Sequence, residues 1–185
     1  MKKKKRIILL AVLLVVIVLT CGFLIYRGVV KSAVVKQCEN YINSYVFDIL
    51  PDEYRNDVNP DCIIPEDFIN DKLSDIEDQY RELFTESEYI SEVSKKKEWY
   101  RTKIITGEVI LCDYAVEVKK IHSFRLDNFN EAEIFFVVSQ KGIDKVKNGD
   151  SYMEEPFDAD VGYRFFLKKS GDNWKIFKVH FASIM

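Results

Sequence analysis

The sequence VGYRFFLKKSGDNWKIFKVHFA, residues 161–182, decides the fold class of this protein. Two segments rich in aromatic and β-branched residues, Val161–Lys169 and Trp174–Ala182, flank the turn sequence Ser170-Gly171-Asp172-Asn173. Aromatic and β-branched side chains favour strands, whereas Gly, Asp and Asn favour tight turns. The stretch therefore predicts an antiparallel β-hairpin.

The same composition, with polar and apolar residues alternating, begins at Trp99. It predicts three earlier strands, at Arg101–Leu111, Tyr114–Phe124 and Ala132–Gln140. The segment Lys141–Asp160 is polar and contains Gly142, Gly149 and Pro156. We expect it to be a long connection, and because long loops are often functional, it is a candidate for docking a partner.

Helical periodicity precedes the strands. Apolar residues recur every three or four positions in Val29–Leu50, a helix that Pro51 would end, and again in a helix that starts at Pro65. A third, weaker stripe covers Ser87–Lys97, in which the lysines 95–97 suggest a solvated face. Helices followed by strands predict an α+β domain, with amphipathic helices packed on one face of a curved antiparallel sheet.

A long apolar segment, Ile7–Tyr26, opens the chain and contains no charged residue. At a rise of 1.5 Å per residue it spans about 30 Å, the thickness of the hydrocarbon core of a bilayer. The basic tip at residues 1–6 favours a cytoplasmic N-terminus. We therefore predict a signal anchor: a cytoplasmic tip (1–6), a single-pass transmembrane helix (7–26) and an extracytoplasmic domain (29–185) in the cell membrane.

Two alternatives would remove the anchor. The first is cleavage of a signal peptide after Ser32, although apolar regions of signal peptides span only about 7–15 residues. The second is lipoprotein processing at Cys21, where Thr20 occupies a position that normally holds a smaller residue.

Composition excludes several classes of function. All 30 acidic residues but only 22 of the 27 basic residues follow the basic tip, so the rest of the chain has a net charge of −8 and is unsuited to nucleic acid. The chain has two histidines and no CxxC pair, so we expect no zinc site, and no motif indicates another metal or a cofactor. Cys38 and Cys112 fall in apolar patterns, where a buried free thiol is the commoner state, although one disulfide among Cys38, Cys62 and Cys112 is possible.

Two stretches resemble the NTF2-like superfamily: the turn and strand Cys112–Val118, and the closing Lys169-Ser170-Gly171-Asp172-Asn173-Trp174-Lys175-Ile176. The resemblance covers Val29–Met185 and implies helices in the concavity of a strongly bent sheet; a cystatin-like topology is the alternative. A basic tip, one anchor and such a domain also resemble the assembly components of type IV secretion and conjugation machines.

NTF2-like enzymes use Asp, Tyr or His side chains inside the cone as bases and hydrogen-bond donors. The resemblance therefore makes Tyr45, Tyr114, Trp174 and His180 candidate ligand-binding residues, although each also fits a packing role. The sequence contains no Ser-His-Asp or Cys-His arrangement with supporting context and no Gly-rich phosphate loop.

Two hypotheses about function follow. The first is a membrane-anchored, non-catalytic domain that binds protein partners, as a component of an envelope or secretion assembly. The alternative is a small-ligand binder or an NTF2-like enzyme that uses the concave sheet as its pocket.

Overall fold

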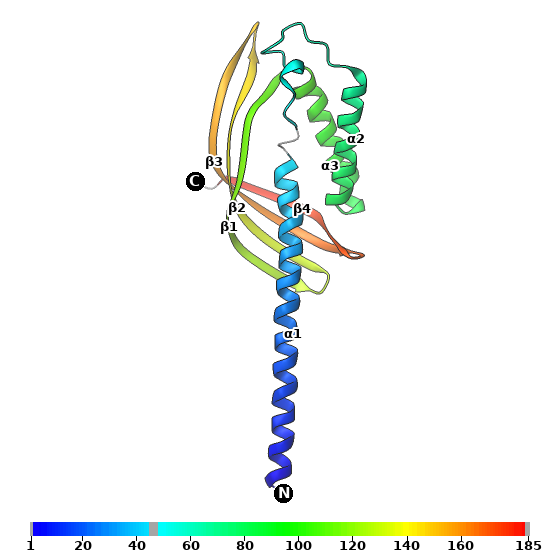
Figure 1. The fold of residues 1–185 in the computed structure, drawn as a ribbon, viewed down its shortest axis with the longest axis vertical. Coiled ribbons are helices and arrows are strands. Elements are labelled where there is room, and N and C mark those ends of the chain that lie inside the picture. Colours follow the sequence, from blue (N-terminus) through cyan, green and yellow to red (C-terminus); the bar gives the residue numbers. More distant parts are fainter. Residues whose placement is uncertain (1, 45–47, 184–185) are drawn as a thin grey trace.

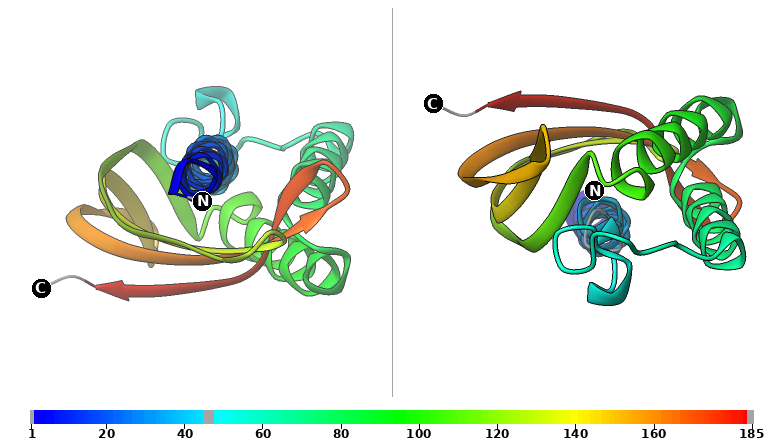
Figure 2. Two further views of the ribbon diagram at one scale, coloured as in Figure 1. Left: turned by 90° about the horizontal axis from the view of Figure 1, so that it is seen from below. Right: turned by 90° about the horizontal axis from the view of Figure 1, so that it is seen from above.

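The computed structural model describes residues 2–44 and 48–183 of the chain. A 42-residue helix, α1 (Lys2–Asn43), leads into a domain of two further helices and a four-stranded sheet (Figure 1). The α+β class predicted from the sequence is confirmed, with the helices on the concave side of a curved antiparallel sheet (Figure 2).

Helix α1 has two different environments along its length. From Leu9 to Ile25 its side chains are exposed, and an 18-residue window there has a mean hydropathy of 3.0, so α1 is long and apolar enough to cross a membrane. From Val30 onward one face is buried in the domain, at Val30, Val34, Cys38, Tyr41 and Ile42. The helix passes through Gly28 without a break, so the apolar segment and the first amphipathic helix form one rod.

The next elements form a helical layer beside α1. A single 3₁₀ turn, η2 (Asp52–Tyr54), precedes α2 (Glu66–Leu83), which begins directly after Pro65 as predicted. Helix α3 (Glu86–Trp99) follows after a sharp reversal and continues into a π-helical turn, η3 (Tyr100–Ile105).

The sheet is an antiparallel meander in the order β1-β2-β3-β4. Its strands are β1 (Val109–Asn128), β2 (Glu131–Asn148), β3 (Ser151–Ser170) and β4 (Asn173–Ser183). The predicted hairpin at the Ser170–Asn173 turn is confirmed.

The prediction of two separate strands, at Arg101–Leu111 and Tyr114–Phe124, is wrong. Residues 100–105 are helical because Tyr100 and Ile104 lie four residues apart on one buried face, a helical spacing. After Gly107, which adopts a positive φ of 68°, the remainder of both segments forms the single strand β1.

The expected connection at Lys141–Asp160 is also wrong, because this segment forms the distal halves of β2 and β3. The strands pair without interruption up to Asn148 and Ser151. No residue of this arm is fully buried, so its sequence needs little apolar alternation, and cross-strand ion pairs such as Lys141–Asp158, 2.9 Å between charged atoms, join the strands. Pro156 is tolerated because β4 does not reach this part of β3.

The curvature of the sheet has identifiable local causes. The β1–β2 register shifts at four places along β1, and such β-bulges bend a strand and increase its twist. Near the first shift, Gly142 faces a crowded position where an added Cβ would lie 2.3 Å from the carbonyl oxygen of Asp113 and 2.5 Å from the ring of Phe157. The strands can approach this closely only because residue 142 has no side chain.

A salt-bridge cluster fastens the loop after α1 to this arm of the sheet. Asp57 accepts hydrogen bonds from Arg55 (2.9 and 3.1 Å) and from Lys145 of β2 (2.8 Å), and only 5% of its side chain is exposed. Burial by itself raises the pKa of Asp57, but these hydrogen bonds outweigh burial, and the pKa lies below its ordinary value of 3.8.

We predict that Asp57→Asn destabilises the protein by about 1–3 kcal/mol at neutral pH, because it leaves the half-buried donors Arg55 and Lys145 without their carboxylate. The depressed pKa means that the ionised carboxylate favours the folded state. This stabilisation is complete above the unfolded pKa of about 4 and is lost as the pH falls through the folded value. Urea unfolding of the full-length protein in detergent at pH 7 and below pH 4 measures it.

The exposed Asp61 in the same loop provides the matched control, Asp61→Asn, which should leave the unfolding midpoint unchanged. An Asp57→Asn effect of the same size at pH 7 and at the lowest pH would contradict the electrostatic account.

Candidate functional site

The concave face of the sheet is filled by the side chains of the chain itself. Ile134, Phe136 and Phe165 are 0% exposed at its centre. The ring of Tyr41 from α1 packs edge-on against Phe165 at 5.5 Å and against Phe84 at 5.7 Å. The second half of α1 therefore fills the concavity of the sheet.

Of the four residues predicted to bind a ligand, Tyr114, Trp174 and His180 lie at separate places on β1 and β4. Tyr45 lies outside the described residues. Tyr114 is half-buried on β1, with its ring 5.9 Å from that of Phe157, and Trp174 is buried at the start of β4. His180 is exposed on β4, edge-on to Phe166 at 5.4 Å. Tyr114, Trp174 and His180 do not line the cavities beside α2 and α3.

Sequence reasoning missed a buried ion pair. It joins Asp48, which follows α1 in the chain, to Lys96 of α3. Lys96 is 7% exposed and Asp48 is 2% exposed, and the lysine ammonium donates to Asp48 Oδ2. The ammonium also lies 4.8 Å from the ring centroid of Trp99, within cation–π range. The prediction that lysines 95–97 form a solvated face is therefore wrong for Lys96, which follows Val93 by three residues and precedes Tyr100 by four on the buried side of the helix.

Burial dominates the electrostatics around this pair. It raises the pKa of Asp48 and lowers the pKa of Lys96, and each charge partly counteracts the shift of the other. Burial and the neighbouring Asp48 raise the pKa of Tyr100 to about 12. Tyr100 is therefore a hydrogen-bond donor near neutral pH and is unsuited to act as a base.

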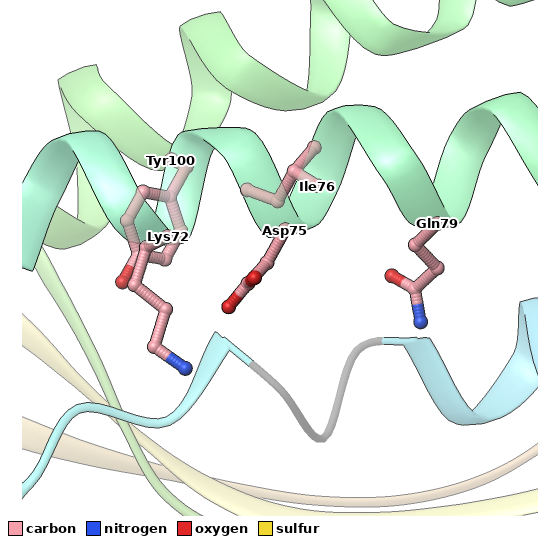
Figure 3. Close-up of a pocket in the computed structure, with 5 residues that line it drawn as sticks. All are labelled: Lys72, Asp75, Ile76, Gln79 and Tyr100. Carbon is pink, nitrogen blue, oxygen red and sulfur yellow. The ribbon is translucent and has the colours of Figure 1, made fainter.

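A small cavity lies beside α2, with a volume of about 170 Å³. Figure 3 shows Lys72, Asp75, Ile76 and Gln79 projecting from α2 on one side of it, next to Tyr100 from η3. The Tyr100 hydroxyl has no hydrogen-bond partner within the described part of the chain. The cavity is smaller than the roughly 300–1,000 Å³ of ordinary ligand sites.

The larger open site is a groove between α3 and β4, which we call the α3–β4 groove. It consists of two adjoining hollows of about 250 and 330 Å³ that share Glu92, Lys95 and Phe181. The aromatic side chains Tyr41, Tyr80 and Trp99 line one hollow, together with the buried Lys96. The other is bounded by apolar residues of β4 and the charged side chains of α3.

The edge of the sheet beside this groove is open. At Ile176 the chain makes one parallel bridge to Phe84, and the amide of Thr85 donates to the carbonyl of Ile176 at 2.9 Å. Beyond Ile176, no other described strand pairs with the outer edge of β4. Phe181, near the end of that edge, is 60% exposed.

Comparison with known proteins gives structural neighbours only. No family model matches the chain, and no curated protein matches it. Solved structures similar to it include an NTF2-like protein of unknown function from Prochlorococcus marinus, at 19% identity and a TM-score of 0.37. That alignment covers 50% of this chain and 62% of the length of that protein.

Two further similar structures come from an envelope and from a secretion system. The intermembrane-space region of the chloroplast protein ARC6 is 11% identical, with a TM-score of 0.42 over 64% of this chain and 94% of that one. An IcmL-like type IV secretion system protein from Legionella pneumophila is 6% identical, with a TM-score of 0.40. That alignment covers 63% of this chain and 80% of that protein. An NTF2-like and a type IV secretion protein are the two kinds that the sequence resembles, but at these TM-scores the similarities assign no family.

We predict that Lys96→Met destabilises the protein by about 3–5 kcal/mol, because it leaves Asp48 buried without its counter-charge. The double variant Asp48→Leu/Lys96→Met should recover most of this loss, since an apolar pair of similar size needs no desolvation of charge. Urea unfolding in detergent measures both. Equal losses in the single and double variants would show that packing, and not the charge pair, sets the cost.

Proposed function

We propose that this chain is a single-pass membrane protein whose extracytoplasmic domain, residues 29–185, binds another protein through the α3–β4 groove. In this proposal residues 1–6 are cytoplasmic, residues 7–26 span the membrane, and the domain has no catalytic role. It acts as a component of an envelope or secretion assembly.

One observation carries the binding mode: the concavity of the sheet is filled, whereas the α3–β4 groove is open beside a free strand edge. A free edge offers backbone hydrogen bonds to an added strand, and the groove offers places for its side chains. An extended segment of a partner protein, with apolar residues at alternate positions, fits both features. Phe84 already pairs with this edge at Ile176, so a partner strand would continue from there.

The same geometry disfavours the small-ligand alternative. The cavity beside α2 is small, and the raised pKa of Tyr100 provides no base. The buried Lys96 is already paired with Asp48. These features support packing and partner binding better than catalysis.

The orientation of the anchor is open to a direct test. A cysteine at Asp172, in the exposed β3–β4 turn, should react with a membrane-impermeant maleimide in intact cells, because the domain lies outside. A cysteine at Lys3 should react only after the membrane is permeabilised. Labelling is measured above that of the native cysteines, and the reverse pattern would overturn the proposed topology.

Photocrosslinking tests the groove in the full-length protein. Benzoylphenylalanine at position 181 should capture a specific protein in cells, whereas the same group at Val58 should not. The two positions are matched in exposure, at 60% and 58%, but Val58 lies in the loop between η2 and α2. The same adducts from both positions would contradict the groove, and capture of a second copy would assign it to self-association.

A further inference from the structure

A second cleft, separate from the α3–β4 groove, lies where α1 leaves its exposed apolar half. It has a volume of about 370 Å³ and lies between α1 and residues 121–124 of β1. Leu24, Arg27 and Lys31 face it from α1, at spacings of three and four residues that place them on one side of the helix. Gly28 adds open space, because a Cβ there would meet no atom within 4 Å.

The charge of this cleft is opposite to that of the domain. Arg27 and Lys31 give it two positive charges, His122 lines it beside them, and none of the described lining residues is acidic. The chain after the basic tip carries a net charge of −8, so a local cluster of cationic groups is not a consequence of overall composition. The cleft is therefore suited to an anion.

Two contacts with Phe124 hold the Arg27 side chain in place. One of its terminal nitrogens donates to the carbonyl of Phe124 at 3.3 Å, and its guanidinium carbon lies 5.9 Å from the centroid of the Phe124 ring. An arginine carries five N–H donors, so this single bond leaves others to bind a phosphate oxygen.

The height of the cleft relative to a bilayer follows from the helix. With the boundary of the hydrocarbon core at Tyr26, the end of the proposed transmembrane segment, Leu24 lies about 3 Å inside this core, whereas Arg27 and Lys31 lie about 1.5 and 7.5 Å outside it, at 1.5 Å per residue. The headgroup layer on each side of a bilayer is roughly 5–8 Å thick. Leu24 thus reaches the acyl chains, while the two cations lie at the level of lipid phosphates.

The turn between β1 and β2 supports the same placement. The Tyr26 hydroxyl donates to the carbonyl of Phe129 at 3.1 Å, and the two rings are 5.5 Å apart. Phe129 is 65% exposed, and Figure 1 shows this turn as the part of the domain nearest the N-terminal half of α1. In the proposed anchored arrangement Tyr26 lies at the interfacial level at which aromatic residues gather, where Phe129 beside it would contact lipid.

We infer that the cleft formed by Leu24, Arg27, Lys31 and His122 binds the headgroup phosphate of an anionic phospholipid. The inference rests on the proposed transmembrane anchor. Bound lipid fixes the domain against the bilayer surface and so sets the direction in which the α3–β4 groove faces.

The test uses full-length protein in detergent with equimolar dioleoyl phosphatidylglycerol and dioleoyl phosphatidylcholine, and native mass spectrometry measures which lipid is retained. The wild-type protein should retain phosphatidylglycerol preferentially, and Arg27→Gln/Lys31→Gln should lower its affinity about 25-fold, because each of the two cations near an anionic headgroup contributes roughly fivefold. Arg101→Gln/Lys147→Gln removes the same two charges from exposed positions in η3 and β2 and should have no effect.

Three outcomes would overturn the inference. The first is equal retention of the two lipids by the wild-type protein, and the second is an equal loss in both double variants. The third is displacement of phosphatidylglycerol by an equal concentration of glycerol 1-phosphate, which would indicate a site for free phosphate esters. Carbonate extraction separates this from the proposed anchor: release of the wild-type protein from membranes would overturn both, whereas retention without lipid preference overturns the inference alone.

Discussion

The structure depends on one continuous helix whose two halves have different surroundings. Up to Ile25 the side chains of α1 are exposed and apolar, and from Val30 one face of the same helix is buried against the sheet. Because a helix without a break transmits its position rigidly, the height and direction of the domain relative to an anchoring membrane are set by α1 itself. Where the two halves of the helix meet, the Tyr26 hydroxyl donates to the carbonyl of Phe129 and so connects the β1–β2 turn to α1.

The same helix decides what the sheet can do. A strongly curved sheet encloses a concave space, and here Tyr41 and its neighbours on α1 fill that space. The remaining recognition surfaces are at the margins, where α3 meets the free edge of β4 and where α1 meets β1. Both proposals concern these margins, one for a partner chain and the other for lipid.

Sequence reasoning failed where the same local pattern is compatible with two different structures. The polar pattern of Lys141–Asp160 predicts a loop, but strands with no fully buried face need no apolar alternation. Its pairing is stabilised by ladder hydrogen bonds and ion pairs instead. Lys96 reads as solvated because lysine is almost never fully buried without a partner, and that partner, Asp48, lies 48 residues earlier in the chain.

The sequence by itself determined the apolar segment, the amphipathic faces of α1 and α2, the closing hairpin and therefore the α+β class. These features are encoded by neighbouring residues, through periodicity and turn chemistry. Only the tertiary structure decided that the concavity is filled, that Asp48 meets Lys96, and that Arg27 and Lys31 face His122 across a cleft. Each of these depends on contacts between residues distant in the chain, which no local pattern specifies.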